Sequence, residues 1–399
     1  MMGVFGLCAW QVQAASKVDI DYDVRLLPDS GQAEVKMTLE QGAAIRQLDF
    51  DLRSGQYSAF KAEGSWQLSA DGKQAAWRPA PGQATLVYRV KLDHRLKNGA
   101  FDSRITSSWA VFRGELLVPP GSLAAAGDKE WVTRLHVELP PGWKRVEAPW
   151  PRIGKNRFRI DDPERTFDRP VGWIAAGHIA SRRTQLGNTQ VSVTGPLGQG
   201  VRRMDSLTLL TFVWPSLSEV FPREPGKLLI VSAGSPMWRG ANGEGNSVFL
   251  GSQLPAVGET GVSPLLRECV KVISRIQGQD RSAWIAEGLA QYYAVTLLQR
   301  AGGLSDDRLR SIQARWQKQG DAVQSIRGAE LDQAAMARTL VLLRDLDSEI
   351  RVKTRNKRSL DDLARAAMRQ GSITTAQFVD LAQALLGEPS TVLDTPLLH

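Results

Sequence analysis

The chain is short of the side chains that most often carry out catalysis. It contains four histidines and two cysteines among its 399 residues. The histidines lie far apart in the sequence, at positions 94, 136, 178 and 399. They give no support for a Ser-His-Asp triad, and no G-x-S-x-G motif accompanies them. A zinc site, which usually includes histidine ligands, would have to bring two of these remote residues together.

Long hydrophobic runs are also missing. Beyond residue 15 no stretch approaches the uninterrupted apolar length of a membrane helix. Residues 1–15 join a short apolar stretch to a small-residue cleavage pattern, V-Q-A, without a basic start, so they are predicted to be a truncated signal peptide of a periplasmic or secreted protein. Cys8 would leave with this segment. Cys269 would then be the only thiol, and no intramolecular disulfide could form.

The remaining composition is that of an ordinary globular protein. Hydrophobic residues make up 42% of the chain and charged residues 23%, and the length predicts two or three domains. The formal net charge of +8 permits an acidic partner, but the basic residues are scattered. The densest basic run, over residues 351–358, has no interleaved aromatic residues and is interpreted as a solvated loop. No nucleic-acid partner is predicted, and the oligomeric state is open.

Residues 16–183 are predicted to form an N-terminal β-sandwich domain. Apolar and polar residues alternate over residues 33–39, 84–92 and 135–139, and the last of these runs ends at the turn sequence P-P-G-W. A period of two residues marks half-buried strands. The spacing of these strands and turns is typical of an antiparallel sandwich.

Residues 184–399 are predicted to form a second domain, with a sheet part up to residue 254 and a helical part from residue 255. In the sheet part, residues 191–193 and 227–231 read as strands, and a helix is predicted from Met204 to Val213, before Pro215. The helical part has apolar residues at three- and four-residue spacings, with Ser359 and Thr374 as expected N-caps. Its predicted helices cover residues 306–319, 331–350, 359–369 and 374–386.

The stretch from residue 265 to residue 293 is the part of the sequence that indicates a function. Its second half, W-I-A-E-G-L-A-Q-Y-Y, resembles the W-x-x-E-G-x-x-x-Y-Y segment of the gluzincin metallopeptidases. The similarity is greatest to the glycyl aminopeptidase family and its aminopeptidase N relatives. The resemblance implies that Glu287 stands at the position of the third zinc ligand. It also implies a His-Glu-x-x-His motif on the preceding helix, with two histidine ligands and a general base.

At the expected motif the chain has R-E-C-V-K instead. Glu268 keeps the general-base position, but Arg267 and Lys271 stand where the two histidine ligands belong. Both are cations at neutral pH and repel a dication. Zinc is the cofactor that the family implies, and we predict that this chain has lost it and carries no metal.

Other family elements follow in the same order, some of them altered. Asp168-Arg169-Pro170 resembles a D-R-P turn before the catalytic part, and residues 346–351 resemble an L-D-x-x-I-R helix. The family Tyr that stabilises the oxyanion falls on Met336, which cannot donate a hydrogen bond. A PDZ domain of the kind that many members append is not expected after the helical part. The resemblance implies an α+β multi-domain fold, a β-sandwich followed by a thermolysin-like domain.

The substrate-cleft motif of the family, G-G-L-E-H-x-x-S, aligns with G-A-N-G-E-G-N-S at residues 240–247. Gly240, Asn246 and Ser247 fit the motif, but its acidic residue falls on Gly243, and Glu244 comes one place late. A shift of one residue in a strand turns a side chain to the opposite face. Read without the family, this stretch is a flexible Gly/Asn loop with no nucleotide-binding spacing.

The two substitutions conserve charge. Zn²⁺ would balance two glutamates, and here Arg267 and Lys271 supply two positive charges against Glu268 and Glu287. We hypothesise that these four residues form a paired cluster that links two helices in place of the metal. The alternative is that both cations point to solvent.

Other chemistries have less support. Cys269 has no histidine near it in sequence and sits among apolar neighbours, which favours a buried structural thiol over a nucleophile. Glutamates in ion pairs are poor candidates for the raised-pKa acid of a glycosidase. Two functions stay open, and the losses at separate sites of both histidine ligands, the cleft acid and the Tyr favour the first. One is an inactive metallopeptidase-like protein of the cell envelope that binds a peptide or partner protein in a retained cleft. The other is a hydrolase with a rebuilt active site.

Overall fold

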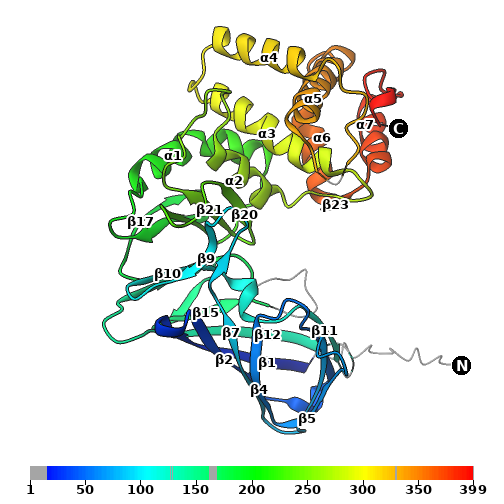
Figure 1. Cartoon of the computed structure of the whole chain (residues 1–399). Coiled ribbons are helices and arrows are strands. Elements are labelled where there is room, and N and C mark those ends of the chain that lie inside the picture. The colour runs from blue at the N-terminus through cyan, green and yellow to red at the C-terminus, as the bar shows by residue number, and fades with distance from the viewer. Residues whose placement is uncertain (1–15, 126, 128, 161–168, 329, 399) are drawn as a thin grey trace, which may run out of the picture. The chain divides into compact units, whose positions relative to one another are not determined.

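The computed structural model describes residues 16–125, 127, 129–160, 169–328 and 330–398 (Figure 1). The predicted signal segment, residues 1–15, and Asp168 of the D-R-P turn lie outside these ranges. The chain divides into two units, each with its own sheets. The first consists of Met1–Leu92, Gly114–Pro141 and Trp150–Pro170, and the second of Asp93–Arg113, Gly142–Pro149 and Val171–His399.

The described residues of unit 1 form two sheets. The seven-stranded sheet has the order β14-β15-β12-β1-β2-β7-β4, and the four-stranded sheet has the order β11-β3-β6-β5. The strands are β1 (Ser16–Leu27), β2 (Gln32–Leu39), β3 (Ile45–Asp51), β4 (Tyr57–Ala62), β5 (Gly64–Leu68), β6 (Gln74–Pro79), β7 (Ala84–Lys91), β11 (Gly121–Ala125), β12 (Lys129–Glu138), β14 (Arg152–Gly154) and β15 (Arg157–Ile160).

The alternating patterns of the sequence become the buried faces of these strands. In β2 and β7 every apolar residue of the pattern is fully buried. Tyr88 of β7 is buried as well, and its hydroxyl donates a hydrogen bond to the carbonyl of Leu117. One pairing differs from the expected antiparallel arrangement, because β1 and β12 run parallel from Ser16↔Lys129 to Arg25↔Glu138. Parallel pairing needs a long connection, and here more than one hundred residues separate the two strands.

A five-stranded sheet of unit 2 has the order β13-β16-β10-β9-β8. Its strands are β8 (His94–Arg95), β9 (Phe101–Ile105), β10 (Trp109–Arg113), β13 (Arg145–Glu147) and β16 (Trp173–Gly177). These segments fall in the part of the sequence that we assigned to the N-terminal domain. They group with unit 2 because their buried residues, such as Val111 and Trp173, share an apolar cluster with Val231 of that unit, and sequence patterning does not reveal such contacts.

A second five-stranded sheet of unit 2 has the order β17-β18-β19-β21-β20. Its strands are β17 (Ile179–Leu186), β18 (Thr189–Pro196), β19 (Lys227–Ala233), β20 (Ala241–Glu244) and β21 (Ser247–Gly251). The three central strands run parallel, and β20 pairs antiparallel with β21 at the edge. The stretch read as a flexible loop is therefore a hairpin, with Gly245 and Asn246 as its turn. That reading, made without the family, was wrong.

Within the described ranges unit 2 has seven α-helices. They are α1 (Arg203–Val220), α2 (Pro264–Ser274), α3 (Ala283–Arg300), α4 (Asp306–Gly320), α5 (Gln333–Lys353), α6 (Leu360–Gln370) and α7 (Thr375–Leu386). A small parallel pair joins β22 (Gln277–Gly278) to β23 (Ser372–Ile373). Short 3₁₀ turns cover Pro28–Ser30, Gly42–Ala44, Gly114–Leu117 and Pro396–Leu398.

The sequence signals for helix ends agree with the structure in two cases. Ser359 and Thr374 are the N-caps of α6 and α7, and both form complete capping boxes. The predicted stop before Pro215 was wrong, since α1 continues to Val220. Pro215 removes one helical hydrogen bond, but the turns beyond it bury Leu217 and Val220 completely, and this burial outweighs the loss.

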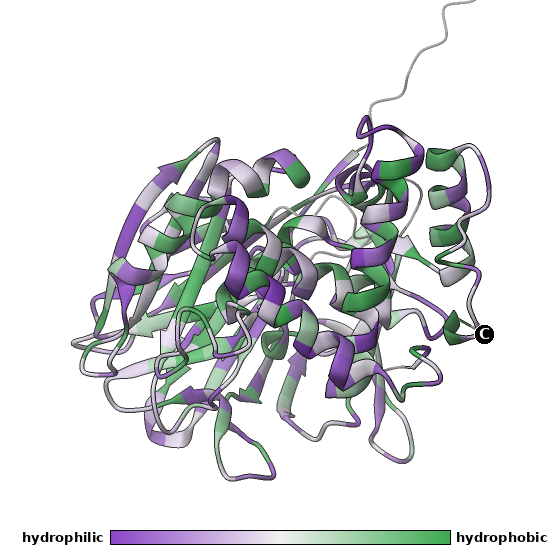
Figure 2. Cartoon of the chain, turned by 90° about the horizontal axis from the view of Figure 1, so that it is seen from above, coloured by the Kyte–Doolittle hydropathy of each residue, from purple (hydrophilic) through white to green (hydrophobic). Residues whose placement is uncertain are grey.

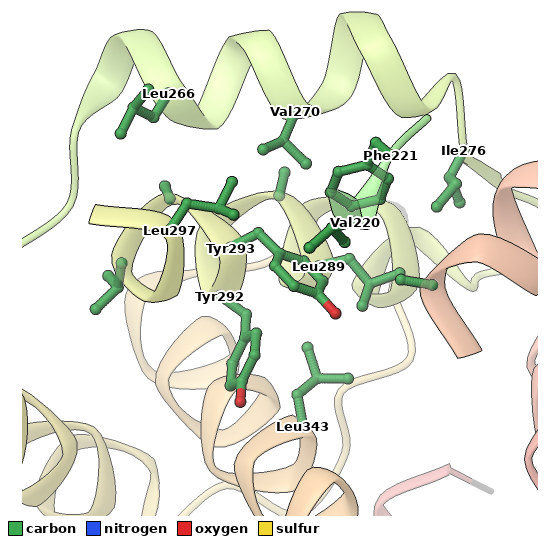
Figure 3. Packing of buried hydrophobic residues seen from close by; sticks show 14 of the residues in the cluster. Val220, Phe221, Leu266, Val270, Ile276, Leu289, Tyr292, Tyr293, Leu297 and Leu343 are labelled. Atoms are coloured by element: carbon green, nitrogen blue, oxygen red, sulfur yellow. The ribbon is translucent and has the colours of Figure 1, made fainter. Parts of the chain in front are cut away.

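The helices pack around one apolar core. They carry green, apolar residues and purple, polar residues along their length (Figure 2). Figure 3 shows Leu266 and Val270 of α2 facing Tyr293 and Leu297 of α3, with Leu343 beyond them. None of the helices in the described part of the chain combines the length and the apolar character that crossing a bilayer requires.

Candidate functional site

The site is built on α2 and α3. Ser263 caps α2 by accepting a hydrogen bond from the Leu266 amide, and Pro264 occupies the first helical position, where its missing N–H costs nothing. The apolar residues of α2 are buried against the core, whereas Arg267 and Lys271, one turn apart, remain about one-third exposed. Glu287 on α3 faces the same side.

Four charged residues meet between these two helices. Lys271 Nζ lies 2.6 Å from Glu287 Oε1 and 3.7 Å from Glu268 Oε2. Arg267 donates to Glu268 Oε1 from Nε at 3.0 Å and from Nη2 at 2.6 Å. We call Arg267, Glu268, Lys271 and Glu287 the charge cluster. It is the arrangement that the charge-balance hypothesis requires, and the alternative with both cations turned to solvent does not occur.

The buried carboxylate of Glu268 accepts hydrogen bonds on both of its oxygens. Its side chain is 1% exposed, so its charge needs partners inside the protein. Arg267 occupies one carboxylate oxygen, and the backbone N–H of Gly243 donates to the other at 2.8 Å. Arg267 and the Gly243 amide therefore fix the carboxylate in one orientation and compete with a water molecule for its oxygens.

Gly243 lets the edge strand β20 approach α2. A Cβ atom at this position would lie 2.7 Å from Val272 Cγ2 and 2.9 Å from the carbonyl oxygen of Glu268. Any side chain here would therefore require the strand to move away from the helix. The contact also brings the Gly243 amide within hydrogen-bonding reach of Glu268.

The other residues of the Gly-rich stretch have structural partners. Glu244 pairs with Arg113 at 3.1 Å. Asn246 Oδ1 accepts hydrogen bonds from Arg223 and Arg275.

Ser247 is fully buried. It accepts from the Trp173 amide at 2.7 Å and donates to the Glu244 carbonyl at 2.8 Å. Gly240 allows the ring of Trp238 to lie directly against the backbone. We predicted that the residues of this stretch line a cleft. That role stays a prediction, and the two hydrogen bonds of Ser247 tie it to the protein interior.

The aromatic residues of the W-x-x-E-G-x-x-x-Y-Y segment join α3 to the last helices. Trp284 donates to Thr375 Oγ1, and the Tyr293 hydroxyl donates to Asp361 at 2.9 Å. Arg300 holds the same carboxylate with two hydrogen bonds. Burial raises the pKa of Tyr293 well above its ordinary value. Sequence reasoning missed Arg300 and Asp361, which lie 61 positions apart and share no motif.

Known structures resemble this one over nearly its whole length. An aminopeptidase N family protein from Idiomarina loihiensis aligns with a TM-score of 0.69 and 13% identity, covering 90% of this chain and 72% of its own. An M1 zinc metallopeptidase variant from Deinococcus radiodurans aligns with a TM-score of 0.59 and 15% identity, covering 96% and 94%. The fold is that of the M1 zinc metallopeptidases. No known family model matches the sequence, and no curated protein matches it either.

Within this M1 fold the residues present do not suit a zinc ion. A catalytic zinc takes three protein ligands from histidine, carboxylate and thiolate. Across the described ranges no group of three or more such residues is placed to hold a metal. Arg267 and Lys271 offer only protonated donors, and Lys271 Nζ already occupies a carboxylate oxygen of Glu287.

Cys269 is not suited to act as a metal ligand or as a nucleophile either. It is fully buried, and burial raises the pKa of its thiol, so the reactive thiolate is not formed at neutral pH. Met336 lies in the first turn of α5, partly buried against the core and lining a pocket with Arg267. The position therefore offers a thioether wall and no hydrogen-bond donor.

Proposed function

We propose that this chain is a catalytically inactive relative of the M1 metallopeptidases that binds a peptide or partner protein. The observation that carries the proposal is the charge cluster, above all the 2.6 Å contact between Lys271 and Glu287. The ammonium group supplies to Glu287 the positive charge that a metal would supply. Arg267 does the same for Glu268.

Three further features support a loss of peptide cleavage. Glu268, at the general-base position, already accepts hydrogen bonds from Arg267 and the Gly243 amide, which compete with a water molecule for its oxygens. Gly243 supplies no acidic side chain. Met336 supplies no donor for an oxyanion, a contribution that is often worth 10²–10³ in rate. These changes lie on β20, α2 and α5, so a single substitution cannot repair them.

The domain roles belong to the same proposal. Unit 1 would be the counterpart of an N-terminal β-sandwich, and the β17–β21 sheet with the helices of unit 2 would be the counterpart of a thermolysin-like domain. Export to the cell envelope, which we predicted from the sequence of residues 1–15, stays part of this proposal. A Deinococcus radiodurans M1 zinc metallopeptidase variant has been solved with a Tyr-Ser-Ala substrate, which supports peptide as the ligand class.

Metal content and peptide cleavage test the proposal together. Purified full-length protein is expected to carry far less than one zinc per chain by elemental analysis, and to leave glycyl- and alanyl-p-nitroanilide uncleaved. The Glu287→Gln variant is the matched control. A metal bound at the family position would be lost from this variant, whereas adventitious metal would not. One zinc per chain that disappears with Glu287→Gln, together with cleavage, would refute the proposal.

A further inference from the structure

A pocket of about 240 Å³ lies among the helices of unit 2, and it is lined by apolar residues on one side and by polar residues on the other. Its apolar side is formed by Trp316, Leu331, Met336 and Leu340 from α4, α5 and the segment between them. Its polar side includes Arg267 of α2 and Arg315 of α4. The pocket adjoins the charge cluster, because Arg267 belongs to both.

Arg315 is the positive charge that the protein leaves uncompensated here. It is exposed, and no described carboxylate lies within ion-pair distance of it. On the same helix Arg310 pairs with Asp307. Arg267 uses Nε and Nη2 on Glu268, which leaves part of its planar guanidinium for another acceptor.

One carboxylate also lines the pocket, and it is already engaged. Asp332 caps α5, and its Oδ1 accepts from the Ala335 amide at 2.7 Å. The lining therefore has two cations against one capping carboxylate. A ligand with a positive end would meet both arginines, whereas a ligand with a negative end would meet the unpaired Arg315.

We infer that this pocket binds a small aliphatic carboxylate. The inference rests on the proposed function, since it names the ligand class of an inactive site. The carboxylate group pairs with Arg315 and Arg267, as guanidinium groups do with planar anions, and the aliphatic body lies against Trp316 and Met336. Met336 suits this role because a flexible thioether adapts its shape to an apolar group. The pocket volume admits a fragment-sized ligand and is smaller than a typical drug site of about 300–1,000 Å³.

The carboxylate could come from two sources, the carboxyl-terminal residue of a peptide or a free organic acid. N-acetyl-leucine represents the first, hexanoate the second, and leucinamide is the cationic counterpart with the same side chain. Ligand-observed NMR titrations with the full chain measure all three. We expect a dissociation constant of about a millimolar for at least one carboxylate and at least tenfold weaker binding of leucinamide.

Two variants make the assignment specific. Arg315→Gln, at an exposed site that leaves the fold intact, should weaken carboxylate binding about five- to tenfold. Lys318→Gln removes the same charge from an exposed position of the same helix outside the pocket lining, and should leave binding unchanged. Stronger binding of N-acetyl-leucine than of hexanoate assigns the peptide source, and the reverse assigns the free acid.

The inference is overturned if neither carboxylate binds up to about 10 mM, if leucinamide binds as well as they do, or if Arg315→Gln and Lys318→Gln behave alike. Zinc content and peptide cleavage measured on the same preparation keep the two ideas apart. Zinc with cleavage overturns the proposed function, whereas a metal-free, inactive protein without carboxylate preference overturns only this inference.

Discussion

Replacing Arg267 with methionine tests whether the charge cluster stabilises the helices that it joins. Methionine keeps most of the aliphatic length of arginine and removes both hydrogen bonds to Glu268. The carboxylate, 1% exposed, then keeps only the Gly243 amide and Lys271 at 3.7 Å. Breaking a buried ion pair by removing one partner costs about 3–5 kcal/mol.

The expected loss is smaller than that range for two reasons. Arg267 is itself about one-third exposed, so water screens part of its charge, and two partners of Glu268 remain. We expect the free energy of unfolding to fall by about 2–3 kcal/mol. Urea denaturation at pH 7 measures this loss as a lower midpoint with an unchanged slope. Hydrogen exchange of the α2 amides should show the same loss and locates it in unit 2.

A double-mutant cycle gives the sharper result. Glu268→Gln alone should destabilise the protein by about 1–2 kcal/mol, because a neutral amide then faces Arg267. The Arg267→Met/Glu268→Gln double variant should lose at least about 1 kcal/mol less than the sum of the single losses. Arg315→Met, an exposed arginine without an ion-pair partner among the described residues, is the control and should change stability by less than about 0.5 kcal/mol. Additive losses, or a loss for Arg267→Met as small as that of the control, would refute the reasoning.

Three other predictions concern acid stability, strand packing and thiol reactivity. Burial acts to raise the pKa of Glu349, but hydrogen bonds led by that from Ser390 lower it from 4.5 to about 2. Its stabilisation, about 2–3 kcal/mol, should be complete above pH 4.5 and lost as the pH falls toward 2. Acid titration of Glu349→Gln should lack this slope. Gly243→Ala, whose Cβ would lie 2.9 Å from the Glu268 carbonyl, should cost about 1–3 kcal/mol in a urea titration. Cys269 should react with a thiol reagent only as fast as the protein unfolds, and fast labelling of native protein would contradict its buried position.

Local features of the fold could be predicted from the sequence, and pairings between distant segments could not. The period-two patterns located β2 and β7, and Ser359 and Thr374 located the starts of two helices, because these signals depend on near neighbours. The parallel pairing of β1 with β12 depends on residues more than one hundred positions apart. The helix through Pro215 was missed because burial of later turns overrides a local stop signal.

The candidate site shows the same division. The charges of the cluster could be counted from the sequence once α2 and α3 were recognised. The sequence resemblance on which this count was based agrees with the observed fold, which is that of the M1 metallopeptidases. The Gly243 amide could not be foreseen, since a backbone donor has no residue signature. Its reach to Glu268 depends on how closely an edge strand packs on a helix. Arg315 was missed because the sequence does not distinguish one surface arginine from another until a pocket is found beside it.

The hydrogen bond from the Gly243 amide to Glu268 makes it difficult to build a metal site at this position by single substitutions. A histidine at position 267 or 271 would remove a positive charge from beside a buried carboxylate before any set of zinc ligands was complete. An acidic side chain at position 243 would first push β20 away from α2 and break the bond that holds Glu268. Each of these single substitutions would lower the stability of the protein. A metal site at this position therefore requires several changes made together.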